Sequence, residues 1–316
     1  MMMTLSTAAL PGPLRIRLDR AAAELTQPAN GPTVDFTLPV GEPALAAPDS
    51  VSWQVFKNPV SLFIGGVTAV LLELAEPRVR SGVWDHTSFR TDPLPRLKRT
   101  GLAAMLTVYG ARGVAERMIA GVGRMHGRVA GVTPAGQAYR ADDPELLDWV
   151  QATASYGFME AYHAFVRPLS DAEKDRFYAE AEPAARLYGA TGAPRSVADQ
   201  VAQFEAMRPK LERSDIVYEF LDIMRRTAIL PGPLRGFQGM FIRAAVEILP
   251  AWSRDLLGLG APYGLKGWEA ALIRTAGRLA DRIVIESAPA AQACRRLGLP
   301  ADYLYRPAVR APRPAG

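Results

Sequence analysis

Apolar residues return every three or four positions over most of the chain, the spacing that places them on one face of an α-helix. No run shows the two-residue alternation of a half-buried strand bounded by turns. The pattern predicts helices at 59–75, 93–109, 111–130, 144–167, 171–188, 197–212, 215–228, 233–248 and 266–285, with a shorter one at 288–297. We therefore predict an all-α fold.

Several of these helices begin with residues that satisfy the free amides of a first helical turn. Asn58, Asp92 and Asp143 each precede a proline, so a capping side chain stands before a residue suited to the first helical position. Ser170 and Glu173 have the spacing of a capping box, in which each side chain accepts a hydrogen bond from the other residue's amide. These capping signals agree with the apolar pattern.

The two ends of the chain differ in composition from the rest. Residues 1–50 contain many prolines and glycines, which favours an extended arm with a short helix at 14–25. Residues 307–316 hold three prolines and are predicted to form a flexible tail. Met1–Leu10 lacks the basic and long apolar segments of a signal peptide. The remaining residues, 51–306, are predicted to form one domain.

The most apolar segment of the chain runs from Pro59 to Ala75. It spans 17 residues and is interrupted by Ser61, Thr68 and Glu73. A membrane-spanning helix needs about 20 predominantly apolar residues. We therefore expect a buried core helix here.

Charge and cysteine content narrow the classes of function. The net charge of +5 comes from 37 basic residues that are scattered among acidic ones, so nucleic-acid binding is not predicted. Cys294 is the only cysteine, which excludes an intrachain disulfide and a thiolate-ligated zinc site. This composition favours a reducing, cytoplasmic location, with loose membrane association as the alternative.

The chain has three histidines, and one of them, His126, lies in the glycine-rich segment GVGRMHGRVAG (121–131). On a helix it shares an apolar stripe with Val122 and Val129. Arg124 and Arg128 would lie about 200° around the helix and face away from it. A histidine on an apolar face is either a hydrogen-bonded core residue or a ligand, and periodicity alone leaves both open.

Glycines surround this histidine at positions 121, 123, 127 and 131. Each glycine in a helix interior costs about 1 kcal/mol relative to alanine. Such a cost suggests that the glycines serve a close approach to the helix backbone. Either another helix packs closely against them, or a flat, bulky group approaches the backbone. In the second case Gly123, one turn before His126, would leave room for a macrocycle.

A polar stripe marks the helix predicted at 93–109. Arg96, Thr100, Ala103 and Thr107 recur with helical spacing. The stripe is either a solvated face or a surface that binds an anionic group, to which an arginine would make charge-assisted hydrogen bonds.

An ordered series of short segments resembles the catalytic domain of the MpaB/latex-clearing-protein (rubber oxygenase) family. The resemblance covers about residues 60–260. The segments are GGVTAVLLELAE (65–76), VWDHTSF (83–89), DPLPRLKRT (92–100), HGRVAG (126–131), YRADDP (139–144), LLDWVQAT (146–153) and RPLS (167–170). The resemblance to this family implies a single large multi-helix orthogonal bundle that encloses an apolar cofactor cavity.

The resemblance also implies haem b, with iron held by an axial histidine. By motif position His126 matches that metal ligand. Arg96 and Thr100 match an arginine and a threonine beside the haem, and Arg99 stands where rubber-cleaving members have lysine. These three residues are the predicted catalytic group, placed to contact haem propionates or bound oxygen.

Gly123, Gln151, Thr153 and His86 complete the predicted cofactor-binding set, together with Arg96. Gln151 departs from the family, because many relatives read WVHAT where this chain reads WVQAT. Glutamine cannot carry protons at neutral pH as histidine does. This departure, with Arg99 in place of lysine, argues against rubber cleavage as the specific reaction.

The resemblance therefore predicts a haem b-dependent oxygenase that uses molecular oxygen on an apolar substrate of isoprenoid or lipid-like character. The alternative is a non-catalytic protein that binds apolar ligands in the same fold without haem. A third hypothesis is a peripheral membrane contact through the helix at 14–25.

Overall fold

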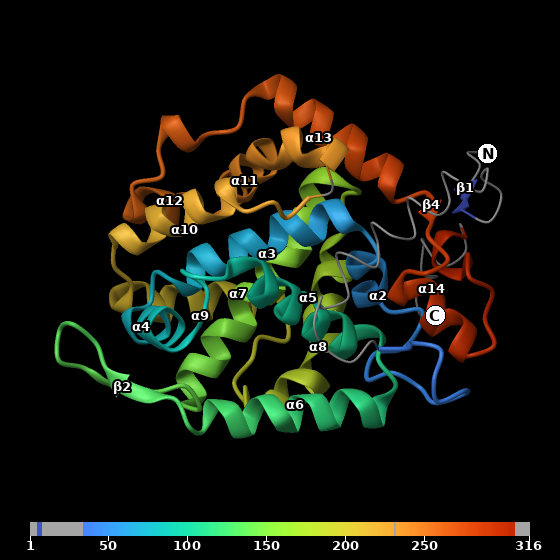
Figure 1. Ribbon diagram of the computed structural model, residues 1–316, viewed down its shortest axis with the longest axis horizontal. Helices are drawn as coiled ribbons and strands as arrows, with labels where there is room; N and C mark the ends of the chain where they lie inside the picture. The colour runs from blue at the N-terminus through green and yellow to red at the C-terminus, as the bar shows by residue number, and fades with distance from the viewer. Residues whose placement is uncertain (1–4, 8–33, 231, 307–316) are drawn as a thin grey trace.

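The computed structural model describes residues 5–7, 34–230 and 232–306, and most of these residues are helical (Figure 1). The α-helices are α2 (Val51–Phe56), α3 (Pro59–Glu73), α4 (Pro77–His86), α5 (Pro93–Tyr109), α6 (Arg112–His126), α7 (Pro144–Phe165), α8 (Asp171–Tyr188), α9 (Val197–Met207), α10 (Asp215–Arg226), α11 (Gln238–Glu247), α12 (Ala251–Leu257), α13 (Gly267–Ala280) and α14 (Pro289–Arg296). The predicted all-α class is confirmed.

Two small sheets were not predicted. β1 (Leu5–Ser6) pairs in parallel with β4 (Ile283–Val284), and β2 (Ala130–Val132) forms an antiparallel hairpin with β3 (Ala138–Arg140). Strands of two or three residues are too short to show an alternating pattern in the sequence.

Helices α3 and α7 cross in the middle of the molecule, and the other helices surround them (Figure 1). The crossing is close because Gly65 meets Gly157: a Cβ added at Gly65 would lie 2.7 Å from the carbonyl oxygen of Gly157. Ile64, Leu71 and Leu72 on α3 have no exposed surface. The segment predicted as a buried core helix is therefore the centre of the fold.

None of the helices in the described ranges is both long and apolar enough to span a membrane by itself. Taken together, α3 and α4 meet the criteria of length and composition, but the two helices bend by 112° at the break between them.

Most of the predicted helix starts are confirmed. Asn58 and Asp143 cap α3 and α7 with their side chains, and Ser170 and Glu173 form the capping box at the start of α8. The prediction for Asp92 is wrong, because its side chain makes no capping hydrogen bond. Its backbone has φ −144° and ψ 70°, which lies outside the extended geometry of the capping residues Asn58, Asp143 and Ser170.

Boundaries differ from the prediction where the chain turns. The helix predicted at 111–130 ends at His126, and Gly127 then leads into the β2–β3 hairpin. Val129 is therefore not on the same helix as His126. The helix predicted at 233–248 begins instead with a 3₁₀ segment at Gly232–Phe237.

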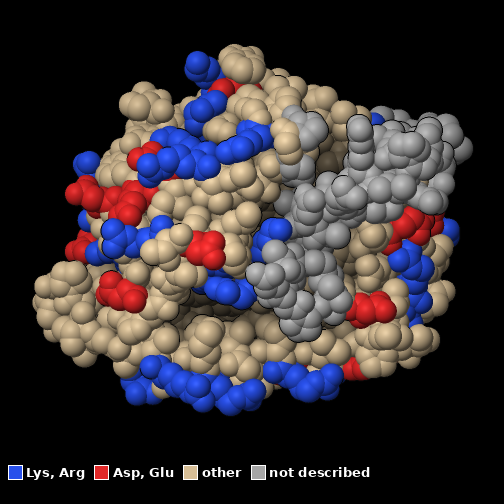
Figure 2. Space-filling view, in the orientation of Figure 1, with Lys and Arg blue, Asp and Glu red and all other residues tan. Residues whose placement is uncertain are grey.

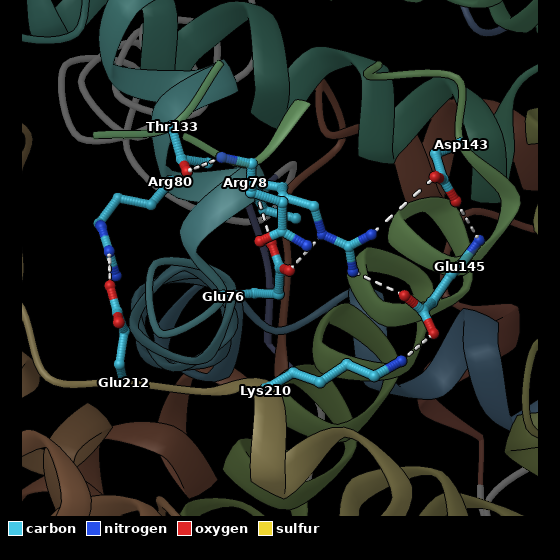
Figure 3. A network of polar contacts seen from close by, with 10 residues as sticks. Glu76, Arg78, Arg80, Thr133, Asp143, Glu145, Lys210 and Glu212 are labelled. Atoms are coloured by element: carbon cyan, nitrogen blue, oxygen red, sulfur yellow. Dashed lines mark hydrogen bonds and ion pairs between the residues drawn. The ribbon is translucent and has the colours of Figure 1, made fainter. Parts of the chain in front are cut away.

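An ion-pair network ties α4 to α7 (Figure 3). Glu76 caps α4 through the amide of Val79 and accepts from Nε of Arg78 at 2.7 Å. The same guanidinium donates to Glu145 on α7 at 2.6 Å, and Lys210 pairs with the other oxygen of Glu145. Because Glu76 is only 1% exposed, its charge depends on Arg78 for compensation.

The predicted arm is described over residues 34–50, and this part packs onto the domain. Phe36 is 1% exposed, and its carbonyl oxygen accepts from Nη1 of Arg296 at 2.9 Å. Nε of Arg296 donates to the carbonyl oxygen of Glu42 at 2.8 Å. The helix predicted at 14–25 and the tail predicted at 307–316 lie outside the described residues.

Candidate functional site

Four helices contribute polar side chains to one cluster. Glu73 is the last residue of α3, Arg96 and Thr100 belong to α5, His126 ends α6, and Thr153 lies on α7. Charge–charge interactions link Arg96 to Glu73 and to His126, and the Thr153 hydroxyl interacts with Glu73. We refer to these five residues as the Glu73–His126 cluster.

Glu73 has an unusual acidity for a carboxyl group. Burial raises its pKa to about 7, although the charge of Arg96 and the Thr153 hydroxyl both lower it. Desolvation therefore dominates over the nearby cation. A carboxyl with this pKa exchanges its proton near neutral pH, which is the property of a group suited to acid–base work.

Arg96 brings a positive charge into the cluster. Its Nη1 donates to Oγ1 of Thr100, and the Thr100 hydroxyl donates to the carbonyl oxygen of Arg96 at 3.1 Å. Burial lowers the pKa of Arg96, the charge of Glu73 raises it, and Arg99 lowers it further. A guanidinium stays protonated at physiological pH despite such shifts.

The surroundings of His126 favour the neutral form of its imidazole. Burial lowers the pKa of its imidazole, and the positive charge of Arg96 lowers it as well, whereas Asp142 acts in the opposite direction. A neutral imidazole keeps a lone pair for a metal ion. The side chain of His126 makes no hydrogen bond to the residues that the structure describes.

The face of α6 at Gly123 is open to solvent, because Gly123 is exposed. A Cβ added at Gly123, one turn before His126 on α6, would meet no heavy atom within 4 Å. Figure 2 shows the surface hollowed above the lower edge of the molecule, where Figure 1 places α6. Basic side chains follow the outer side of that edge, where Arg117, Arg124 and Arg128 are exposed.

These residues fit a haem in kind. A neutral imidazole is the usual proximal ligand of haem iron, and arginines suit its propionates. Within the described ranges, no three His, Cys, Asp or Glu side chains gather to hold a metal ion. A haem needs no such group, because its macrocycle supplies the other ligands.

Two predicted site residues are engaged elsewhere. Nε2 of His86 lies 3.0 Å from the hydroxyl of Tyr139 on β3, and the two rings meet edge to face. Nε2 of Gln151 donates to Oγ of Ser155 on the same helix at 3.1 Å. The structure thus brings Arg96, Thr100, His126 and Thr153 together, and it gives His86 and Gln151 local partners.

Glu73 is the residue that the sequence analysis did not assign to the site. The sequence does contain an indication of its role, because Glu73 is the only charged residue between Pro59 and Ala75. A carboxylate in so apolar a helix has to be compensated or protonated. In the sequence, Glu73 argued only against a membrane-spanning helix.

The fold and the cluster define a class of protein: an all-helical domain in which a partly buried imidazole, a partly buried arginine and a carboxyl with a pKa of about 7 lie near one another. Comparison with protein families matches residues 53–284 to the family described as "ER-bound oxygenase mpaB/B'/Rubber oxygenase, catalytic domain". The protein belongs to this oxygenase family, as the ordered motifs predicted. No curated protein and no solved structure gives a significant match.

Proposed function

We propose that the protein is a haem b-dependent oxygenase acting on an apolar, isoprenoid or lipid-like substrate. The observation that carries the proposal is the cluster in which His126, with a pKa lowered by burial and by Arg96, lies near Arg96 and Glu73, on a helix whose face at Gly123 is open to solvent. When bound, haem would supply the activation of molecular oxygen, which amino-acid side chains cannot provide.

His126 would hold the iron, and Arg96 would bind an anionic group of the cofactor. The hydrogen bonds between Arg96 and Thr100 fix the direction of the guanidinium before any ligand arrives. Arg99 is exposed and carries a second positive charge on the same helix. These charges would offset haem propionates, whose negative charge is costly to bury alone.

Glu73 would hold a proton within the site. Since its pKa is about 7, the carboxyl can accept or release that proton during turnover without a large free-energy cost. It could therefore do the proton transfer that Gln151 cannot do.

Apolar residues lie close to the residues of the polar cluster along their helices. Val70, Leu97 and Val150 pack against the main core and keep some accessible surface. They lie within three positions of Glu73, Arg96 and Thr153 along their helices. They would provide an apolar wall for substrate, and a cytoplasmic location with loose membrane contact would give access to lipid-like molecules.

The test is oxygen incorporation into a defined probe. Haem-loaded protein is incubated with squalene and isotope-labelled molecular oxygen, and products are analysed by mass spectrometry. Labelled, haem-dependent products support the proposal. Squalene binding without haem uptake or labelled product would instead establish the alternative, an apolar-ligand carrier, with which the Gln151 departure is consistent.

A further inference from the structure

Helix α13 exposes a row of large apolar side chains on the outside of the molecule. Trp268 is 62% exposed, Leu272 is 40% exposed and Leu279 is 55% exposed. Their spacing of four and then seven residues places all three on one side of the helix. Single exposed apolar residues are common on soluble proteins, whereas large ones gathered in one place mark a surface that binds something. We refer to these three residues as the α13 apolar row.

The opposite side of α13 is fixed in the fold. Ile273 is 1% exposed, and Gly277 packs so closely against the carbonyl oxygen of Phe165 on α7 that a Cβ there would collide with it. The carbonyl oxygen of Gly277 accepts a hydrogen bond from Nδ2 of Asn58 at 2.9 Å. Figure 1 shows α13 along the upper margin of the molecule, above α3. The apolar row therefore cannot turn inward to leave the solvent.

Positive charge accompanies the apolar row. Arg274 and Arg278 are exposed one turn apart on α13, and neither forms an ion pair with a described residue. Lys266 is exposed immediately before the helix. The one acidic residue of α13, Glu269, is 2% exposed and pairs with Arg243 on α11. The outer side of α13 thus carries basic side chains and no exposed carboxylate.

This combination fits an anionic lipid surface. A helix that lies in a membrane interface places tryptophan and leucine among the acyl chains and lysine or arginine among the headgroups. Each basic side chain near an anionic membrane surface strengthens binding by about fivefold. A second copy of the chain fits less well, because pairing two α13 surfaces would bring their arginines together with no exposed carboxylate between them.

We propose that α13 is the surface through which the protein binds an anionic lipid membrane. The apolar row enters the headgroup region, and Arg274 and Arg278 contact lipid phosphates. The contact requires neither haem nor oxygenase turnover, and α6, which carries His126, lies at the lower edge of the molecule in Figure 1. Failure of the oxygenase proposal would therefore leave this one standing, and the reverse also holds.

The experiment measures flotation of the full chain with vesicles made from equal amounts of phosphatidylcholine and phosphatidylglycerol. We expect binding that weakens at least about tenfold when Arg274→Gln and Arg278→Gln are combined. Arg117→Gln combined with Arg124→Gln is the matched control, because it removes the same charge from exposed positions on α6. This control should bind like the unmodified protein, and equal losses in the two variants would overturn the proposal.

The apolar row is tested in the same assay. Leu272→Ser combined with Leu279→Ser should weaken binding at least about tenfold, because two leucines no longer enter the lipid. Leu187→Ser on α8 is the control, since Leu187 is 45% exposed and lies on another helix. Unchanged binding in the α13 variant would overturn the proposal. So would a dimer of the unmodified protein, formed without lipid and lost in the same variant, because a second copy would then cover the row.

A fluorescence measurement on the unmodified protein does not depend on the folding of a variant. Trp268 is the most exposed of the five tryptophans, so its emission should move to shorter wavelength when the anionic vesicles are added. Trp268→Phe should lose this shift while it still binds. Vesicles of phosphatidylcholine alone should bind at least about tenfold more weakly. Absence of binding to anionic vesicles, or equal binding to both kinds, would overturn the proposal.

Discussion

Glu73 on α3 and Arg96 on α5 are coupled through charge without forming a direct ion pair. The guanidinium lowers the pKa of the carboxyl, and the carboxylate raises the pKa of the guanidinium, while burial acts against the charged form of both groups. The carboxyl pKa remains at about 7 because burial outweighs the attraction. The pair therefore carries a net positive charge when Glu73 is protonated and is neutral when it is ionised.

Glu73→Gln should change how stability depends on pH. In the folded protein the pKa of Glu73 is about 7, against 4.5 for an unperturbed glutamate, so between these values the folded state keeps a proton that the unfolded chain has released. The free energy of unfolding should fall as pH rises through this window, by at most about 3 kcal/mol. Denaturant unfolding between pH 4.5 and 8 should show this slope, and Glu73→Gln should flatten it.

Glu116→Gln is the control for that experiment, because Glu116 is exposed on α6. It should leave the slope unchanged. An unchanged slope in Glu73→Gln would show that Glu73 does not titrate near neutrality.

Arg96→Met should raise two pKa values at once. The arginine lowers the pKa of Glu73 by attraction and that of His126 by repulsion, so its removal raises both. The imidazole shift is measurable by NMR titration of the ring protons. Arg99→Met is the comparison: Arg99 acts on Arg96 but does not contribute to the shift of His126. A His126 pKa that stays constant in Arg96→Met would contradict the described geometry.

Gly65→Ala should destabilise the fold through the α3–α7 crossing. Its Cβ would lie 2.7 Å from the backbone of Gly157, so the helices must separate. Overpacking of this kind costs about 1–3 kcal/mol. The neighbouring Gly66→Ala is the matched control, because its Cβ would meet only a ring atom of Phe158 at 3.9 Å. It should be neutral or stabilise by up to about 1 kcal/mol. Thermal unfolding of both variants distinguishes the two positions, and equal effects would argue against a close crossing.

Arg78→Met should lower the free energy of unfolding more than most other substitutions of an arginine in this chain. It leaves the carboxylate of Glu76 buried without its cation, a loss of about 3 kcal/mol or more. Arg186→Met breaks a pair with Glu182 in which the arginine side chain is 59% exposed, and it should cost less than about 1 kcal/mol. Urea unfolding measures both, and a small effect at Arg78 would show that Glu76 is compensated in another way.

The fold was largely predictable because helix signals are local. The spacing of apolar residues and the caps at Asn58, Asp143 and Ser170 act within one or two turns, and they located α3, α7 and α8 closely. Helix α4 was missed because Arg78 and Arg80, which look like surface residues, are buried through ion pairs with distant residues. Such pairs cannot be read from local sequence.

The site was predictable only in part for the same reason. The motif order placed Arg96, Thr100 and His126, which the structure brings together. Glu73 was missed because its role depends on the approach of α5 to the end of α3, a contact between segments more than 20 positions apart. His86, which was predicted to belong to the cofactor-binding set, has a local partner that the sequence did not indicate, because its Nε2 lies 3.0 Å from the hydroxyl of Tyr139 on β3.

Whether His126 holds a haem can be read from the visible absorption spectrum of protein purified from haem-supplemented cells. We expect a Soret band in the unmodified protein, its loss in His126→Ala, and its retention in His163→Gln. The Nδ1 atom of His163 accepts a hydrogen bond from the amide of Leu169, outside the cluster. A folded protein that stays colourless after reconstitution, or a Soret band unchanged in His126→Ala, would contradict the assignment of His126 as the haem ligand.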